Sequence, residues 1–374
     1  MLASVSNKDS KTLSDPQVLL CSIVVVVFNT VMTLANRALG SAFMYKRGGM
    51  ITLAIFVGEY MSMIYLSIPL LLSRQFRKEH FALLHAESKT QKKKFTEINQ
   101  IWLALPAFLD TLNTTLKNLA LLLLPASIQQ MLLGGTIITA CIVSRVMLKR
   151  QMMYFHWIGN ILALIGFALA GYSSVLNDSD QSDSNTWNII IGITLIVIEL
   201  FFSALQTNIE EWIFHQNAIH VARGTGLEGF FGIIWSFSFM AAFSYISCPR
   251  SSMCDISGYF DDPVLGLQEA FADPRVLALL VTMTLSASIY NLSIVTLIKR
   301  VSCIYPFFCA AMSTLVIWLL SVRLGLERFT WIAFAYQSSG FMFLLAGNLC
   351  YNGYLNCCFK PDDSALDNKD ALTL

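Results

Sequence analysis

Four polar side chains that could bind a solute or a proton lie on one face of the apolar stretch 101–123. The spacing i, i+3, i+4 and i+7 places them on the same side of a helix: Asp110, Asn113, Thr114 and Lys117. A charge at the centre of a membrane costs roughly 2.5–3.5 kcal/mol, so such residues usually face a cavity or a partner. Asp110 and Lys117 are two turns apart and are not expected to pair directly. Each should therefore meet a ligand or a group on another helix, with an ion pair between helices as the alternative.

Polar stripes also occur in other apolar stretches. Their residues are Asn29, Thr33, Asn36, Glu59, Glu199, Ser203, Gln206, Glu210, Tyr290 and Asn291. A single Ser, Thr or Asn in a membrane helix usually bonds to a neighbouring helix, whereas several stripes together can line one cavity. We predict a substrate site formed by Glu59, Asp110, Asn113, Lys117, Gln130, Glu199, Gln206, Tyr290 and Asn291.

The composition is typical of a membrane protein. Of 374 residues, 55% are hydrophobic and 13% are charged, and the mean hydropathy is +0.60. Soluble domains carry about 25% charged residues. The net charge of +1 favours no nucleic-acid partner. No HExxH, GxGxxG or Walker-type motif is present, so we predict no enzyme activity, no cofactor and no metal site.

Ten stretches have the length and apolarity of a membrane-spanning helix. They are 17–38, 50–72, 101–123, 126–148, 153–175, 187–210, 226–247, 275–298, 302–322 and 329–350. Lipid offers no partner to free backbone N–H and C=O groups, which favours helices. The N-terminus lacks the pattern of a signal peptide, so the first helix should be retained. The prediction is an all-α polytopic membrane protein with ten transmembrane helices.

The distribution of Lys and Arg predicts the orientation. If the N-terminus is cytosolic, most basic loop residues are cytosolic too, above all those in 73–100. Both termini are then cytosolic, and the loop 176–186, which has no basic residue, is not. That loop holds the glycosylation sequon of Asn177. Cys248 and Cys254 flank a short noncytosolic segment and could form a disulfide there.

The third to fifth stretches resemble the eighth to tenth. At a nearly constant offset, Asn118-Leu119 matches Asn291-Leu292, Trp157-Ile158 matches Trp331-Ile332, and Gly166-Phe167 matches Gly340-Phe341. Five helices per repeat is an odd number, so the second repeat must enter the membrane inverted, an arrangement that places a cavity near the midplane. The predicted organisation is an N-tail 1–16, a first repeat 17–175, a linker 176–186, a second repeat 187–353 and a C-tail 354–374.

A glycine-rich run begins the predicted seventh span. Gly226, Gly229 and Gly232 follow helical spacing and are expected to let another helix approach closely. Glu228, in the same run, is placed near a helix N-terminus, where the helix dipole favours a carboxylate.

Several motifs resemble those of the drug/metabolite transporter superfamily and, within it, the F branch of solute carrier family 35. They include Gly58-Glu59-Tyr60, Pro106-Ala107, Gln130-Met131-Leu132, the run from Arg223 to Gly232, and Leu324-Gly325-Leu326-Glu327. The resemblance implies ten helices in two inverted repeats and transport across an internal membrane. Other branches exchange nucleotide sugars. Relatives tend to have basic residues where Leu133 stands and near Ser313, so their anion pocket does not transfer to this chain.

The deep charges indicate a cationic or zwitterionic solute, or proton coupling. The spans contain three deep carboxylates, Glu59, Asp110 and Glu199, but one deep cation, Lys117. A pyrophosphate would need several cations or helix N-termini to bind it. The first alternative function is a nucleotide-sugar antiporter. The second is a nontransporting scaffold or receptor, in which every buried charge would be paired. The expected partners are a small-molecule solute and the lipid bilayer, with a homodimer as an open option. Golgi, lysosome-like and mitochondrial membranes all remain open as locations.

Overall fold

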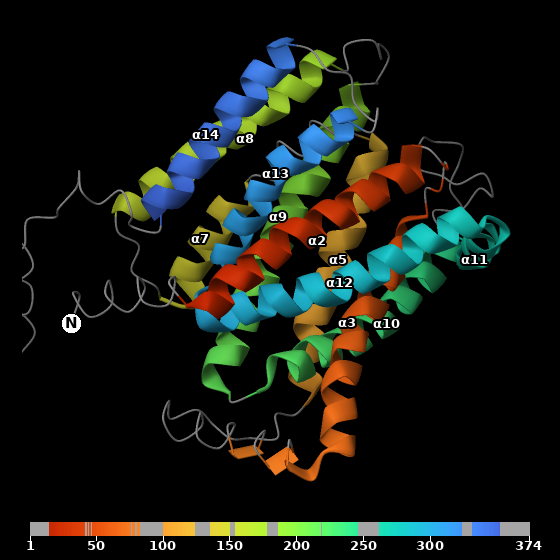
Figure 1. Cartoon of the computed structure of the whole chain (residues 1–374). Coiled ribbons are helices and arrows are strands. Elements are labelled where there is room, and N and C mark those ends of the chain that lie inside the picture. Colours follow the sequence, from red (N-terminus) through yellow and green to blue (C-terminus); the bar gives the residue numbers. More distant parts are fainter. Residues whose placement is uncertain are drawn as a thin grey trace, which may run out of the picture.

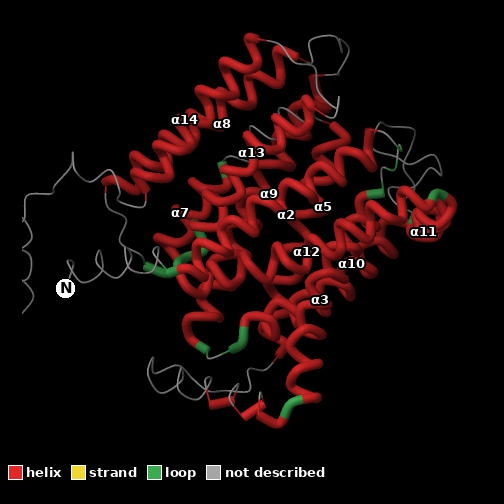
Figure 2. Tube along the Cα trace, viewed as in Figure 1, coloured by secondary structure: helices red, strands yellow, loops and turns green. Residues whose placement is uncertain are grey.

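The computed structural model describes residues 15–41, 43, 45, 47–75, 77–78, 81–82, 100–123, 135–149, 154–177, 186–217, 219–245, 262–323 and 331–351. All secondary-structure elements in these ranges are helices, and the long ones form a single bundle (Figures 1 and 2). The first part of the chain contributes α2 (Pro16–Ser41), α3 (Gly48–Leu72), the short 3₁₀ helix η1 (Gln100–Leu103), α5 (Ala104–Leu123), α7 (Thr136–Met147) and α8 (Tyr154–Asn177). The second part contributes α9 (Thr186–Gln216), α10 (Val221–Tyr245), α11 (Pro263–Ala272), α12 (Pro274–Arg300), α13 (Tyr305–Arg323) and α14 (Trp331–Tyr351).

Five helices in the described part of the chain are long and apolar enough to cross a membrane. These stretches are Pro16–Gly40, Gly48–Leu70, Ile190–Gln216, Val221–Tyr245 and Pro274–Arg300. They lie in α2, α3, α9, α10 and α12. Many of their large apolar side chains are exposed, including Ile23, Ile64 and Ile234. Such an outer surface suits contact with lipid rather than water.

Two helix boundaries and one short helix differ from the sequence prediction. α9 continues to Gln216, well beyond the predicted end at 210, and α10 begins at Val221 instead of 226. Glu228 therefore lies two turns inside α10, where the helix dipole no longer acts on a side chain. Our assignment of Glu228 to a helix N-terminus was wrong, because charged residues at a span end conceal where the helix itself begins. The short helix α11 was not predicted.

The helices pack in pairs that involve both parts of the chain. α3 packs on α10 and α12, α5 on α9 and α10, and α2 on α12 and α13. α7 packs on α9, and α8 lies beside α14 along one edge of the bundle (Figure 1). Residues from α7, α8, α9, α13 and α14 share one apolar core, which includes Ile137, Ala163, Ala204, Phe308 and Leu344.

Glycines bring two of these helix pairs into close contact. In α10, Gly226 lies against Met63 and Gly229 against Glu59, both in α3; a Cβ on Gly229 would be 2.7 Å from the Cβ of Glu59. The predicted close approach of the α10 glycines is thus confirmed. In the other pair, a Cβ on Gly166 of α8 would be 2.6 Å from the carbonyl oxygen of Gly340 in α14. Only residues without a Cβ allow such crossings.

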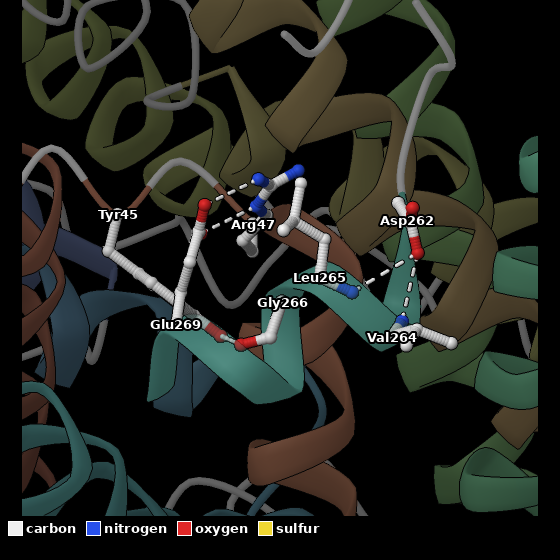
Figure 3. A network of polar contacts seen from close by, with 7 residues as sticks. All are labelled: Tyr45, Arg47, Asp262, Val264, Leu265, Gly266 and Glu269. Carbon is white, nitrogen blue, oxygen red and sulfur yellow. Dashed lines mark hydrogen bonds and ion pairs between the residues drawn. The ribbon is translucent and has the colours of Figure 1, made fainter. Parts of the chain in front are cut away.

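An ion pair between the buried Arg47 and the partly exposed Glu269 connects α11 to the start of α3. Nε and an Nη of Arg47 donate to the two carboxylate oxygens of Glu269 at 2.9 and 2.8 Å (Figure 3). The hydroxyl of Tyr45 donates to the carbonyl of Gly266 at 3.1 Å (Figure 3). Asp262 caps α11 by accepting from the backbone N–H groups of the two residues after Pro263. These contacts connect segments far apart in the sequence at one end of the bundle.

A second ion pair joins the beginning of α2 to the end of α12. Arg300 donates to Asp15 at 2.8 Å, and both side chains are partly exposed. The sequence prediction places Asp15 and Arg300 on the cytosolic side, and Arg47 and Glu269 on the other side. Each ion pair thus joins two residues that the predicted topology assigns to the same side.

Candidate functional site

Four carboxylic side chains from four different helices gather in the interior of the bundle. They are Glu59 of α3, Asp110 of α5, Glu210 of α9 and Glu228 of α10. Glu59 is 4% exposed, and Glu210 and Glu228 are each 3% exposed. The four groups are close enough for their charges to interact. We call these four residues the acidic cluster.

Glu59 is bound from the side of α12. Its Oε1 accepts a hydrogen bond from Nδ2 of Asn291 at 2.6 Å. The close crossing at Gly229 brings α10 against the Cβ of Glu59 from the other side. Glu59 therefore stands between two helices of the second part of the chain, although it belongs to the first part.

A chain of hydrogen bonds connects α5 to the acidic cluster through α9. Nδ2 of Asn113 donates to Oε1 of Gln206 at 2.7 Å, and Nε2 of Gln206 donates to Oε1 of Glu210 at 2.9 Å. On α5 itself, the hydroxyl of Thr114 lies 3.4 Å from an oxygen of Asp110. The predicted polar stripes of these two helices therefore face each other.

Glu210 and Glu228 contact each other directly. Their carboxyl groups lie at hydrogen-bonding distance, and both are buried. Oε1 of Glu228 has no amide, hydroxyl or amine donor among the described residues. One end of the acidic cluster is therefore a pair of carboxyl groups, and one oxygen of this pair, Oε1 of Glu228, receives no hydrogen bond from the described residues.

Glu199 and Lys117 lie near the acidic cluster. Glu199 is 4% exposed, and its charge interacts with Lys117 and with Asp110. Oε2 of Glu199 has no hydrogen-bond partner within the described residues. The side chain of Lys117 also interacts with Asp110 but is exposed at the surface of the bundle. Lys117 is the cation that the described part of the chain brings to these carboxylates.

The remaining predicted site residues are placed differently or lie outside the described ranges. Tyr290 packs beside an apolar group from α2, α12 and α13 that contains Val25, Leu297 and Cys309. Gln130, Cys248 and Cys254 fall outside the described residues, and Asn177 is the last residue of α8. Their assigned roles stay predictions. Within the described residues, no three His, Cys, Asp or Glu side chains are arranged to hold a metal ion.

Sequence reasoning placed Glu210 in a polar stripe and considered Glu228, but included neither in the predicted site. Both were assigned to the ends of apolar stretches, where a charge needs no special explanation. The signal that could have found them is the pair of motifs Glu210-Glu211 and Gly226-Leu227-Glu228-Gly229. A glycine run that lets two helices touch also brings the carboxylate within it to the interface.

Apolar helices around a buried polar centre are typical of polytopic membrane proteins that move solutes or ions. The nucleotide-sugar transporter family model matches residues 16–243, which is more than half of the chain. The chain belongs to this family. Its membership identifies a multi-pass membrane transporter and not an enzyme.

Known relatives agree with this membership and narrow it to the F branch of solute carrier family 35. Solute carrier family 35 member F6 of Rattus norvegicus is 28% identical over 73% of this chain and 73% of its own length. The Homo sapiens protein of that name is 29% identical over 66% of this chain and 65% of its own. An uncharacterized protein of Schizosaccharomyces pombe is 27% identical over 69% of this chain and 75% of its own.

Solved structures are similar in fold, among them a crystal structure of a protein. It superposes with a TM-score of 0.52 at 10% identity and covers 92% of this chain and 99% of that chain. At this identity the similarity concerns the fold alone.

Proposed function

We propose that this protein transports a small cationic or zwitterionic solute across an endomembrane by alternating access, coupled to protons, with the acidic cluster as its central binding site. The single observation that carries the proposal is the convergence of Asp110, which is partly buried, with the buried Glu59, Glu210 and Glu228 from four helices. Four carboxylates at short range in a medium of low dielectric constant repel one another strongly. A bound cation or bound protons would relieve that repulsion.

The pattern of helix contacts supports two inverted repeats of five helices each. If α2, α3, α5, α7 and α8 correspond to α9, α10, α12, α13 and α14, the main contacts between helices have counterparts. The contact of α5 with α9 corresponds to that of α12 with α2, and the contact of α3 with α12 to that of α10 with α5. The pairs α3–α10 and α8–α14 correspond to themselves. This symmetry is what an inverted repeat requires, and such repeats alternate access by rocking of the two halves.

The repeat also accounts for the crossing of α8 and α14. Gly166 and Gly340 are matched positions of the two repeats, and they face each other at that crossing. Two equivalent residues meet when they lie near the axis that relates the repeats. The proposal extends membrane spanning to α5, α7, α8, α13 and α14.

A nucleotide-sugar antiporter is the second candidate, because the matching family model describes nucleotide-sugar transporters. A nucleotide diphosphate carries several negative charges and needs Arg, Lys or helix N-termini to bind it. The described part of the chain brings Lys117 near these carboxylates, and its side chain is exposed at the surface of the bundle. This balance favours a cationic solute.

A nontransporting scaffold is disfavoured by the unsatisfied carboxylates. A scaffold gains nothing from a buried charge without a partner, which costs stability. Oε2 of Glu199 and Oε1 of Glu228 are buried and lack hydrogen bonds among the described residues. Unsatisfied groups at such depth in a membrane protein typically serve a substrate or ion pathway.

The test is a ligand screen followed by transport. Purified protein would be screened by thermal shift against organic cations, amino acids, nucleotides and nucleotide sugars at two pH values, and hits would be tested for uptake into proteoliposomes. Asp110→Asn should weaken binding of a cation by tenfold or more, whereas Arg145→Ala, an exposed cation at the end of α7, serves as control. Stabilisation by a nucleotide that is lost in Lys117→Ala would overturn the proposal in favour of the antiporter.

A further inference from the structure

Glu210 and Glu228 form the one carboxyl–carboxyl contact that the acidic cluster contains among the described residues. Both belong to the second part of the chain, on the adjacent helices α9 and α10. Each side chain is at most 3% exposed, so bulk water does not reach the pair. Oε1 of Glu228 has no hydrogen-bond partner within the described part of the chain.

The chemistry of two touching carboxyl groups requires a proton. An ionised carboxylate is an acceptor only, so two of them cannot hydrogen-bond to each other. A protonated carboxyl group provides one O–H donor, and one proton is enough to bridge the pair. Two carboxylates that share one proton are a known outcome of placing like charges side by side.

The surroundings leave the pair short of positive charge. Glu59 on α3 and Asp110 on α5 face it with further carboxylates, and Gln206 on α9 donates one hydrogen bond to Glu210. From α12, Asn291 donates to Glu59 and not to the pair. Lys117 lies beyond Asp110 and is exposed. Neighbouring groups therefore add negative charge or neutral donors, so the pair must obtain its compensation from a proton or a bound cation.

We propose that Glu210 and Glu228 share one exchangeable proton and that a cationic solute displaces it. This inference rests on the proposed function and names the groups that couple transport to protons. When the solute binds at the acidic cluster, the shared proton leaves to the aqueous phase to which the site is open. When the solute leaves on the other side, the pair takes a proton from that phase. One proton is exchanged for one monovalent cation, so the exchange moves no net charge.

Gln206 acts as a positioning residue in this scheme. Its Nε2 donates to Oε1 of Glu210, and its own Oε1 accepts from Asn113. The side chain is thus held from α5 and fixes the carboxyl group of Glu210 toward Glu228. Gln206→Leu should weaken the pH dependence of cation binding, and Gln206→Glu should not restore it because the donor is missing.

The first experiment detects the proton without any solute. Infrared spectra of the full-length protein at neutral pH should contain a carbonyl-stretch band of a buried protonated carboxyl group. Glu210→Gln and Glu228→Gln should each lose it, since a glutamine amide donates to the remaining carboxylate without a proton. Glu211→Gln is the matched control, because Glu211 is equally buried but accepts from the backbone N–H of Cys303 at 2.8 Å. A band that both pair variants retain would overturn the proposal.

The second experiment measures coupling with choline and tetraethylammonium as probes. Their affinities should rise about tenfold per pH unit, and binding in weak buffer should release about one proton per cation. Glu228→Gln should bind with no pH dependence. Cation binding without proton release would overturn the coupling pair while the proposed substrate class stands. If neither probe binds at any pH although the infrared band is present, the substrate class fails and the coupling role fails with it.

Discussion

Oε1 of Glu59 accepts a hydrogen bond from Nδ2 of Asn291 at 2.6 Å, across 232 positions of the sequence. This contact joins α3 to α12, and it places a donor from the second part of the chain on a carboxylate of the first. Glu59 is 4% exposed, so this hydrogen bond is made where water does not compete for it.

Replacing Asn291 by Ala should destabilise the protein by about 1–3 kcal/mol, because a buried carboxylate loses its donor. Unfolding in detergent at neutral pH would measure the effect. In a double-mutant cycle with Glu59→Gln, the two losses should be less than additive, since both variants remove the same hydrogen bond. Full additivity would show that the contact contributes nothing to stability.

The ion pair between Arg47 and Glu269, at the start of α3, should make the stability of the protein depend on pH. Hydrogen bonds from Arg47 hold the pKa of Glu269 below its usual value. A carboxyl group whose pKa is lowered on folding stabilises the protein above its unfolded pKa, about 4.3, and loses that effect as the pH falls through the lower folded value. Glu269→Gln should therefore lower the melting temperature at pH 7 but have little effect in strong acid. An equal shift at both pH values would contradict the assignment.

Arg47→Lys provides a more selective version of the same test. Arg47 binds Glu269 with two N–H groups at once, and a lysine ammonium cannot reproduce that fork. We expect Arg47→Lys to lose most of the pH-dependent stabilisation although the charge is kept. Arg275→Lys, at an exposed pair with Asp273, is the control and should leave the melting temperature within a degree or so.

The α3–α10 crossing should be sensitive to a single methyl group. A Cβ at Gly229 would lie 2.7 Å from the Cβ of Glu59, so Gly229→Ala must push the helices apart. We expect a loss of about 1–3 kcal/mol and weaker solute binding, because the acidic cluster spans this crossing. Gly40→Ala is the matched control, because no atom lies within 4 Å of the position that the new methyl group would take. Similar losses in both variants would refute the close-contact explanation.

The predicted orientation can be tested at Asn177, the last residue of α8. If the loop that follows is noncytosolic, Asn177 should be glycosylated, and Asn177→Gln should remove a glycosidase-sensitive mobility shift. The sequons at Asn113 and Asn291 lie inside α5 and α12, where no glycan fits, so they serve as internal controls. A shift that persists in Asn177→Gln would contradict the orientation.

Much of the helical framework follows from the sequence alone. Stretches such as 50–72 and 275–298 predict α3 and α12 to within about two residues at each end, because lipid leaves a long apolar segment no alternative to a helix. The i, i+3, i+4 spacing also predicts that Asp110 and Asn113 share a face, since helical geometry is local. Where a helix ends in polar sequence, as α9 does at Gln216, hydropathy carries no signal.

The tertiary structure decided which polar faces meet. Asn113 bonds to Gln206 and Asn291 to Glu59 across 93 and 232 positions, and no local pattern specifies such partners. Glu228 joins the acidic cluster because close glycine packing draws α10 onto α3, and Glu210 reaches the cluster from α9. Lys117, by contrast, shares a face with Asp110 yet reaches the outside of the bundle. Periodicity determines the face on which a side chain lies, whereas the packing of the other helices determines what that face contacts.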